Sequence, residues 1–87
     1  MEKLLSIIEY VVREARIRWR DVRVDRVKEA RSKYYVYMVV SGYNVKAIVY
    51  KYRFKVRVYS RLKGLSIALQ RIFERGYRRV LRESGGV

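Results

Sequence analysis

One short segment of this chain places four cations at alternate positions. Residues 50–59 read Tyr-Lys-Tyr-Arg-Phe-Lys-Val-Arg-Val-Tyr, so in an extended chain the basic side chains share one side and the apolar ones the other. The basic residues are Lys51, Arg53, Lys55 and Arg57. Ammonium and guanidinium groups are the side chains best suited to bind phosphate. Because four neighbouring like charges repel one another, the pattern predicts a polyanionic partner.

The region around this segment contains no acidic residue. Between Ala30 and Phe73 there are ten Lys or Arg and no Asp or Glu, in a chain with a net charge of +14. Seven of the nine Tyr also lie between residues 34 and 59. Solvated protein surfaces normally mix charges of both signs. Basic residues interleaved with aromatic ones are the composition expected of a surface that binds single-stranded nucleic acid.

The composition excludes most familiar catalytic chemistry. The chain has no His and no Cys, so imidazole bases, thiol nucleophiles and the usual zinc ligands are absent. Asp21, Asp25 and Glu29 could together hold Mg²⁺, but Arg and Lys residues interleave with them and favour ion pairing. We therefore expect a protein that is not an enzyme and has no catalytic residues, no metal and no cofactor.

Hydrophobic periodicity predicts one domain over residues 1–87, with a helix at each end. Apolar residues recur at helical spacing from Glu2 to about Arg18, and again from Leu62 until Ser84-Gly85-Gly86, with Ser60 positioned to cap the second helix. Three apolar residues fall outside the first helix's stripe and suggest a contact between protomers, so we expect a homo-oligomer. These are Ile7, Tyr10 and Ile17.

The middle of the chain predicts three or four antiparallel strands, which makes the fold class α+β. The expected strands cover residues 21–28, 34–40 and 43–59, the last with a bend or bulge near 49–52 because it is about three times the usual length. Ser41-Gly42 suits a two-residue hairpin turn. No run of apolar residues is long enough to cross a membrane, and we expect a cytoplasmic protein.

The Ser41-Gly42 turn also predicts which side chains share a face. It pairs Val40 with Tyr43, and the alternation then groups Tyr34, Val36, Met38, Val45 and Val49 on one face, next to the four cations. We expect that face to be the exposed binding platform. The helices would cover the opposite face, which carries Tyr35, Tyr37, Ile48, Tyr50, Tyr52 and Phe54. A turn near residues 49–52 would instead make the cations the rim of a cleft lined by Tyr35, Tyr37, Tyr50 and Tyr52.

The predicted binding residues are the cations and tyrosines of this region together with basic residues of the last helix. They are Lys46, Lys51, Arg53, Lys55, Arg57, Tyr34, Tyr35, Tyr37, Tyr50, Tyr52, Tyr59, Arg61, Lys63, Arg71 and Arg75. Trp19, at the end of the first helix's apolar stripe, is expected in the core.

The order of elements resembles several nucleic-acid-binding families. Helix, strands, helix with Ser60-Arg61-Leu62-Lys63 before the last helix resembles the double-stranded RNA-binding domain, although that family's Lys-Lys-x-Ala-Lys pattern is missing. Residues 34–81 resemble integrase-type domains that lay a sheet in the DNA major groove. Leu62-Lys63-Gly64-Leu65 resembles part of small ribonuclease toxins, in which this turn precedes the strands.

The size, basicity, Tyr-rich strands and lack of Cys look most similar to the ThermoDBP-related single-stranded nucleic-acid-binding proteins of hyperthermophilic archaea. That resemblance implies a sheet flanked by helices, with an apolar cleft and basic edges. We therefore expect a sequence-tolerant binder of single-stranded DNA or RNA. A module for double-stranded RNA or DNA and a small ribonuclease are the alternatives.

Overall fold

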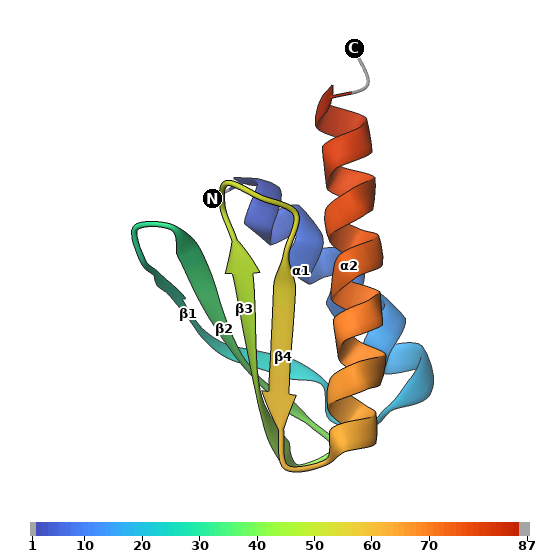
Figure 1. Ribbon diagram of the computed structural model, residues 1–87. Helices are drawn as coiled ribbons and strands as arrows, with labels where there is room; N and C mark the ends of the chain where they lie inside the picture. The colour runs from blue at the N-terminus through green and yellow to red at the C-terminus, as the bar shows by residue number, and fades with distance from the viewer. Residues whose placement is uncertain (1, 86–87) are drawn as a thin grey trace.

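The computed structural model describes residues 2–85, which form two helices and four strands (Figure 1). In chain order the elements are α1 (Glu2–Arg18), β1 (Arg23–Glu29), β2 (Lys33–Val40), β3 (Tyr43–Tyr50), β4 (Val56–Ser60) and α2 (Lys63–Gly85). The strands form one antiparallel sheet in the order β1-β2-β3-β4. The predicted α+β fold class, with a sheet between two helices in the sequence, is confirmed.

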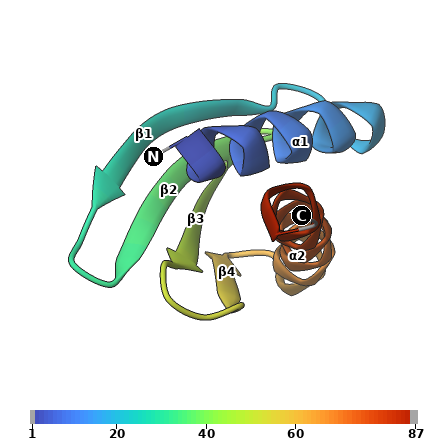
Figure 2. The ribbon, with the colours of Figure 1, turned by 90° about the horizontal axis from the view of Figure 1, so that it is seen from above.

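Both helices pack on the same face of the sheet, which curves around them (Figure 2). α1 buries Leu4, Val11 and Ala15, which are spaced so that they fall on one side of a helix. α2 contributes Leu69 and Phe73, both fully buried. The opposite face of the sheet therefore has no helix over it.

The apolar residues outside the predicted stripe of α1 have partners within the same chain. Ile7 is 2 % exposed and belongs to the core, and the Tyr10 ring lies against Gly76 of α2. The prediction that Ile7 contacts another protomer is therefore wrong, because its side chain is buried in the core of its own chain. Tyr10 is half-buried and packs against α2 of the same chain. Ile17 is 77 % exposed. The expectation of a homo-oligomer now rests on Ile17 alone and stays a prediction.

The hairpin between β2 and β3 forms at the predicted turn. Val40 pairs with Tyr43, Met38 with Val45, and Tyr34 with Val49, which confirms the predicted register. Ser41 and Gly42 both have positive φ, 50° and 83°, as a two-residue turn that matches the strand twist requires. Gly42 adopts this conformation without the steric cost that a side chain would add.

The long strand predicted for residues 43–59 is two strands joined by a loop at 51–55. The Tyr50 amide donates to the Lys55 carbonyl at 3.1 Å and closes the loop, after which Val49 pairs with Val56. Paired residues of neighbouring strands share a face, so the inward positions are odd-numbered in β3 but even-numbered in β4. Arg57 therefore lies on the face of Ile48, and the prediction that it shares a face with Val49 is wrong.

The assignment of the two sheet faces was wrong. Val36, Met38 and Val49 are at most 2 % exposed and pack under the helices, so they are core and not an exposed platform. Along β2 and β3 this face is aliphatic except for Tyr34 and Tyr43 at its two ends, so its burial removes few polar groups from water. The Tyr35 and Tyr37 face stays open, because burying it would also bury the cations that neighbouring strands place there.

A bulge in β1 decides which of its side chains join the open side. Val24 pairs with Met38 and Arg26 with Tyr37, so Asp25 is the extra residue.

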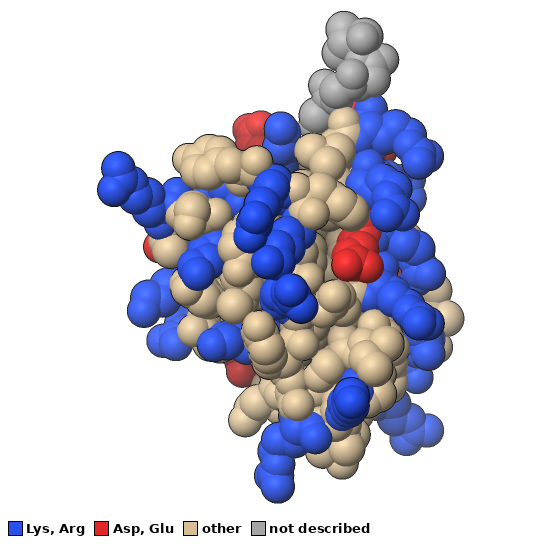
Figure 3. All heavy atoms as spheres, viewed as in Figure 1, with Lys and Arg blue, Asp and Glu red and all other residues tan. Residues whose placement is uncertain are grey.

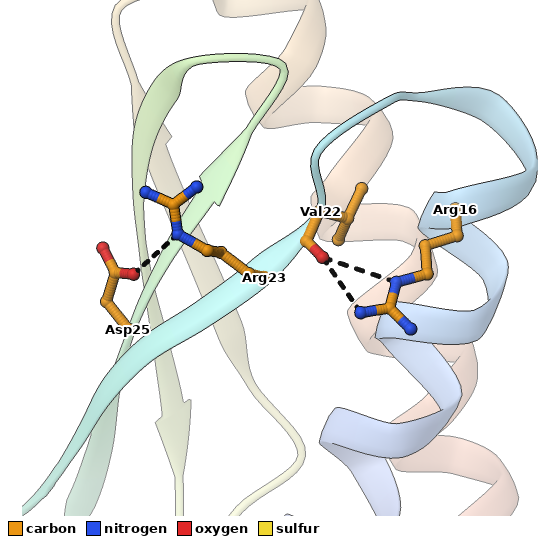
Figure 4. A network of polar contacts seen from close by, with 4 residues as sticks. All are labelled: Arg16, Val22, Arg23 and Asp25. Carbon is orange, nitrogen blue, oxygen red and sulfur yellow. Dashed lines mark hydrogen bonds and ion pairs between the residues drawn. The ribbon is translucent and has the colours of Figure 1, made fainter.

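The connection from α1 to β1 is held by Arg16, whose Nη2 and Nε donate to the Val22 carbonyl at 3.2 and 3.4 Å (Figure 4).

The predicted cap of α2 is not formed by Ser60. Its hydroxyl donates to the Leu62 carbonyl at 2.7 Å and lies 2.6 Å from the Ser66 hydroxyl. The first hydrogen bond of the helix runs from the Ser66 amide to the Leu62 carbonyl, so the helix begins after Leu62.

Candidate nucleic-acid interface

The candidate site is the face of the sheet turned away from the helices, which we call the open face. The strand register places on it basic side chains from all four strands, tyrosines from β2, β3 and β4, and one isoleucine. They are Arg26 and Lys28 of β1, Lys33, Tyr35 and Tyr37 of β2, Lys46, Ile48 and Tyr50 of β3, and Arg57 and Tyr59 of β4. Their alternation is that of a pleated strand with one buried side.

Cations and aromatic rings alternate across the open face at contact distance. The Lys46 ammonium lies 5.8 Å from the centre of the Tyr35 ring and 5.9 Å from that of Tyr59. The Arg26 guanidinium lies 4.7 Å from the Tyr37 ring. Such contacts hold the positive charges at the rings and keep both groups at the surface. Tyr59 is the most open of these rings, at 53 % exposure.

The open face is poor in negative charge. Asp25, at the bulge of β1, pairs with Arg23 at 3.2 Å (Figure 4). Glu29 pairs across the sheet end with Lys51 at 2.6 Å rather than with a neighbour in β1. The predicted ion pairing is confirmed for Asp25 and Glu29, the latter with Lys51 in place of a neighbour in sequence, whereas the ion pairs among residues 2–85 do not include Asp21. Figure 3 shows Lys and Arg side chains spread over the molecule with few acidic atoms among them.

The four cations singled out in the sequence do not form one row. Arg57 belongs to the open face, whereas Lys51, Arg53 and Lys55 lie on the loop at one end of it. The loop still contributes to the surface, because Arg53 and Lys55 each lie 5.2 Å from the Tyr50 ring.

Lys51 is directed toward the helices rather than along the open face. Its hydrogen bond to Glu29 lowers the pKa of that carboxyl and raises the pKa of the Lys51 ammonium. Its Nζ also lies 4.8 Å from the Tyr34 ring centre. Lys51 and Tyr34 line a pocket of about 560 Å³ between the loop and the helix ends, together with Tyr50, Tyr52 and Tyr77. Tyr34 was predicted for the exposed platform and belongs to this pocket instead.

The expected cleft of four tyrosines therefore does not exist as one site. Tyr50 and Tyr52 line the pocket at the sheet end, whereas Tyr35 and Tyr37 lie on the open face. Tyr50 connects the two, because its ring contacts Lys33 of the open face at 5.6 Å.

The basic residues predicted on the last helix divide between two locations. Lys63 and Arg71, together with Arg61 before the helix, line a groove between β4 and α2. Arg75 is exposed on α2 but does not line that groove.

Sequence reasoning missed the contribution of β1 and of Lys33 to the open face. Strict alternation through β1 would place Arg26 and Lys28 beside Val24, on the buried face. The spacing of three between Val24 and Val27 was the available signal, because it indicates one extra residue between two inward positions. Tyr77, which holds the loop, was also missed.

Comparisons with family profiles, with curated proteins and with solved structures find no match for this chain. Within residues 2–85, no helix is long and apolar enough to span a membrane. The same residues contain no group of three acidic, His or Cys side chains suited to a metal ion.

Proposed function

We propose that this protein binds single-stranded DNA or RNA on the open face of its sheet, without preference for sequence. The observation that supports this proposal is the alternation of tyrosine rings, exposed at Tyr59 and half-buried at Tyr35 and Tyr37, with Lys and Arg on a face whose acid, Asp25, is already paired. Bases of an unpaired strand can stack on Tyr59, Tyr35 and Tyr37, and its phosphates can meet the cations between them.

The chemistry of the face favours an unpaired strand over a duplex. In a duplex the base faces are stacked on one another and cannot reach tyrosine rings, so the aromatic part of the open face would have no role. A bound base can replace the Lys46 ammonium on the Tyr59 ring, and the ammonium is then free to pair with a phosphate. The contact exchanges one ring partner for another and needs no base-specific hydrogen bond.

The proposal is for a binder and not an enzyme. Among the acidic residues that could hold a catalytic metal, Asp25 is engaged by Arg23 and Glu29 by Lys51. Because nucleic acid is met inside the cell, a cytoplasmic location is part of this proposal.

The proposal predicts binding that weakens steeply with salt. A fluorescently labelled oligothymidine should bind at about 50 mM NaCl, and its affinity should fall with a log–log slope of about 0.7 per phosphate contact. The double variant Lys46→Gln/Arg57→Gln should lower that slope by about 1.4. Absence of binding at low salt, or binding that does not respond to salt, would refute the proposal.

The role of the rings is tested separately with Tyr59→Ala. Loss of one stacked base should cost about 1–3 kcal/mol of binding free energy. Tyr43→Ala is the matched control, because Tyr43 is also an exposed strand tyrosine but pairs with Val40 at the hairpin end, outside the open face. Equal losses in both variants would show that stacking on Tyr59 is not involved. Competition by unlabelled duplex more effective than by single strand would favour the duplex-binding alternative.

A further inference from the structure

The edge of the sheet at β4 forms a second basic surface. β4 pairs with β3 on one side and faces α2 on the other, where a groove of about 460 Å³ lies between strand and helix. Three cations line it, Arg61, Lys63 and Arg71, against one acid, Glu74. Ser60, Ser66 and Gln70 complete the polar part of its wall.

The groove is not suited to a partner β-strand. The Val58 amide, which points out of the sheet edge, donates to the Gln70 side-chain oxygen at 3.2 Å. That donor is therefore occupied, and the α2 backbone stands alongside the edge where an added strand would lie. The excess of cations instead fits an extended anion that meets side chains and not the strand backbone.

The groove and the open face are continuous around the end of β4. A shallow hollow of about 330 Å³ on the open face is lined by Tyr37 and Lys46 and also by Tyr59, Ser60 and Arg61. The last three residues line the groove as well. Figure 3 views the molecule from this side and shows Lys and Arg atoms over the sheet and along α2.

We propose that a nucleic-acid strand bound on the open face continues over Tyr59 and Arg61 into the groove between β4 and α2. The open face holds bases by stacking, and the groove holds backbone phosphates through Lys63 and Arg71. This inference rests on the proposed function. It adds the course that the bound strand takes over the protein and the strand length needed to follow it. A strand long enough to turn the edge gains contacts that a short one cannot reach.

The test compares oligothymidines of about 5 and about 15 nucleotides, which span the site sizes of small single-strand-binding domains. The variant Lys63→Gln/Arg71→Gln removes two cations found only in the groove. The long oligonucleotide should lose about tenfold in affinity and its salt slope should fall by about 1.4, while the short one should change less than about twofold. The control Arg13→Gln/Arg18→Gln removes the same charge from exposed positions of α1.

The outcomes separate this inference from the function on which it rests. If the short oligonucleotide does not bind the unaltered protein, the proposed function itself fails. If it binds, and the groove variant leaves the long oligonucleotide unaffected, the open face is used but the groove is not. Equal losses for both lengths, or in the α1 control, would show a general effect of net charge and would also overturn the path. Circular dichroism of each variant checks that the fold is intact.

Discussion

At the scale of single residues, Tyr77 links the core to the loop between β3 and β4. Its hydroxyl donates to the Tyr50 carbonyl at 2.6 Å and lies 3.2 Å from that of Arg53. Its ring meets the edge of Phe54, with centres 5.2 Å apart. Burial raises the pKa of the Tyr77 hydroxyl. A residue of α2 therefore determines where the loop presents its cations.

We predict that Tyr77→Phe lowers the free energy of unfolding by about 1 kcal/mol, the usual net value of one hydrogen bond. Hydrogen exchange should become faster at the amides of residues 51–55. Tyr43→Phe, which removes an exposed hydroxyl, is the control and should change neither quantity. If hydrogen exchange in Tyr77→Phe is unaltered, the ion pair of Lys51 with Glu29 holds the loop without the Tyr77 hydroxyl.

The raised pKa of Tyr77 also has a consequence at alkaline pH. The unfolded chain releases this proton near pH 10 and the folded chain releases it higher. The contribution to stability is therefore complete below pH 10 and is lost as the pH rises through the folded-state pKa. Urea unfolding measured across this range should show a smaller decline for Tyr77→Phe than for the unaltered protein.

At the scale of elements, Gly76 sets how closely the two helices approach. A Cβ at this position would lie 2.8 Å from Cδ1 of the Tyr10 ring, 3.4 Å from Cγ and 3.5 Å from Cβ. The 2.8 Å distance is shorter than two carbon atoms allow, so the Tyr10 ring must turn out of its packed position or α1 and α2 must move apart.

We predict that Gly76→Ala destabilises the protein although alanine favours helix by about 1 kcal/mol. Gly64→Ala is the matched control, because Gly64 lies in the first turn of α2 with no atom within 4 Å of an added Cβ. Thermal unfolding should show a lower midpoint for Gly76→Ala and an equal or higher one for Gly64→Ala. A rise in both midpoints would contradict the close packing at Tyr10.

The helices and the hairpin of β2 and β3 were predictable because the residues that specify them are close together in the sequence. Helical periodicity located α1 and α2 within a few residues, and the Ser41-Gly42 turn determined the register of β2 and β3. The length of the run 43–59 predicted a bend near 49–52, close to the loop at 51–55, but the bounds of the loop were not predicted because residues 50–59 alternate without a break in composition. A strand and a loop of this kind differ only in what the backbone pairs with, and that depends on distant residues.

The choice of the buried face was also beyond local reasoning. Both faces of β2 and β3 are apolar enough to form a core, and the tyrosine face offers more area. What separates them is the placement of Arg26 and Lys28 by the bulge in β1, together with Lys46 and Arg57. The residue types of the open face were therefore predictable, but their grouping was not.

At the scale of the whole molecule, the net charge of +14 opposes folding because like charges repel one another in the compact state. Within residues 2–85 the ion pairs are those of Arg23 with Asp25, Lys51 with Glu29, and Arg79 with Glu83. Most Lys and Arg side chains of this part of the chain therefore take part in no ion pair. A bound polyanion would remove that repulsion and stabilise the folded chain.

We predict that salt acts with opposite signs on stability and on binding. Raising NaCl from about 0.01 to 1 M shortens the screening length from about 30 to 3 Å, so the unfolding midpoint of the free protein should rise. A gain of about 1 kcal/mol corresponds to roughly 4–8 °C for a domain of this size. Over the same range the complex with an oligonucleotide should weaken. A midpoint that falls with NaCl would contradict this balance, and repeating the series in sodium fluoride separates screening from specific anion binding.

The order of the strands has a consequence for how the chain is made. Each strand pairs with its neighbour in sequence, so the sheet grows by successive hairpins, whereas α1 and α2 join opposite ends of the chain. A ribosome adding about 5–20 residues per second needs roughly 2–9 seconds to pass from Arg18 to Lys63. During that interval the apolar side of α1 lacks its partner helix. The nascent chain is then most exposed to aggregation or to chaperones, and synthesis of α2 ends that period.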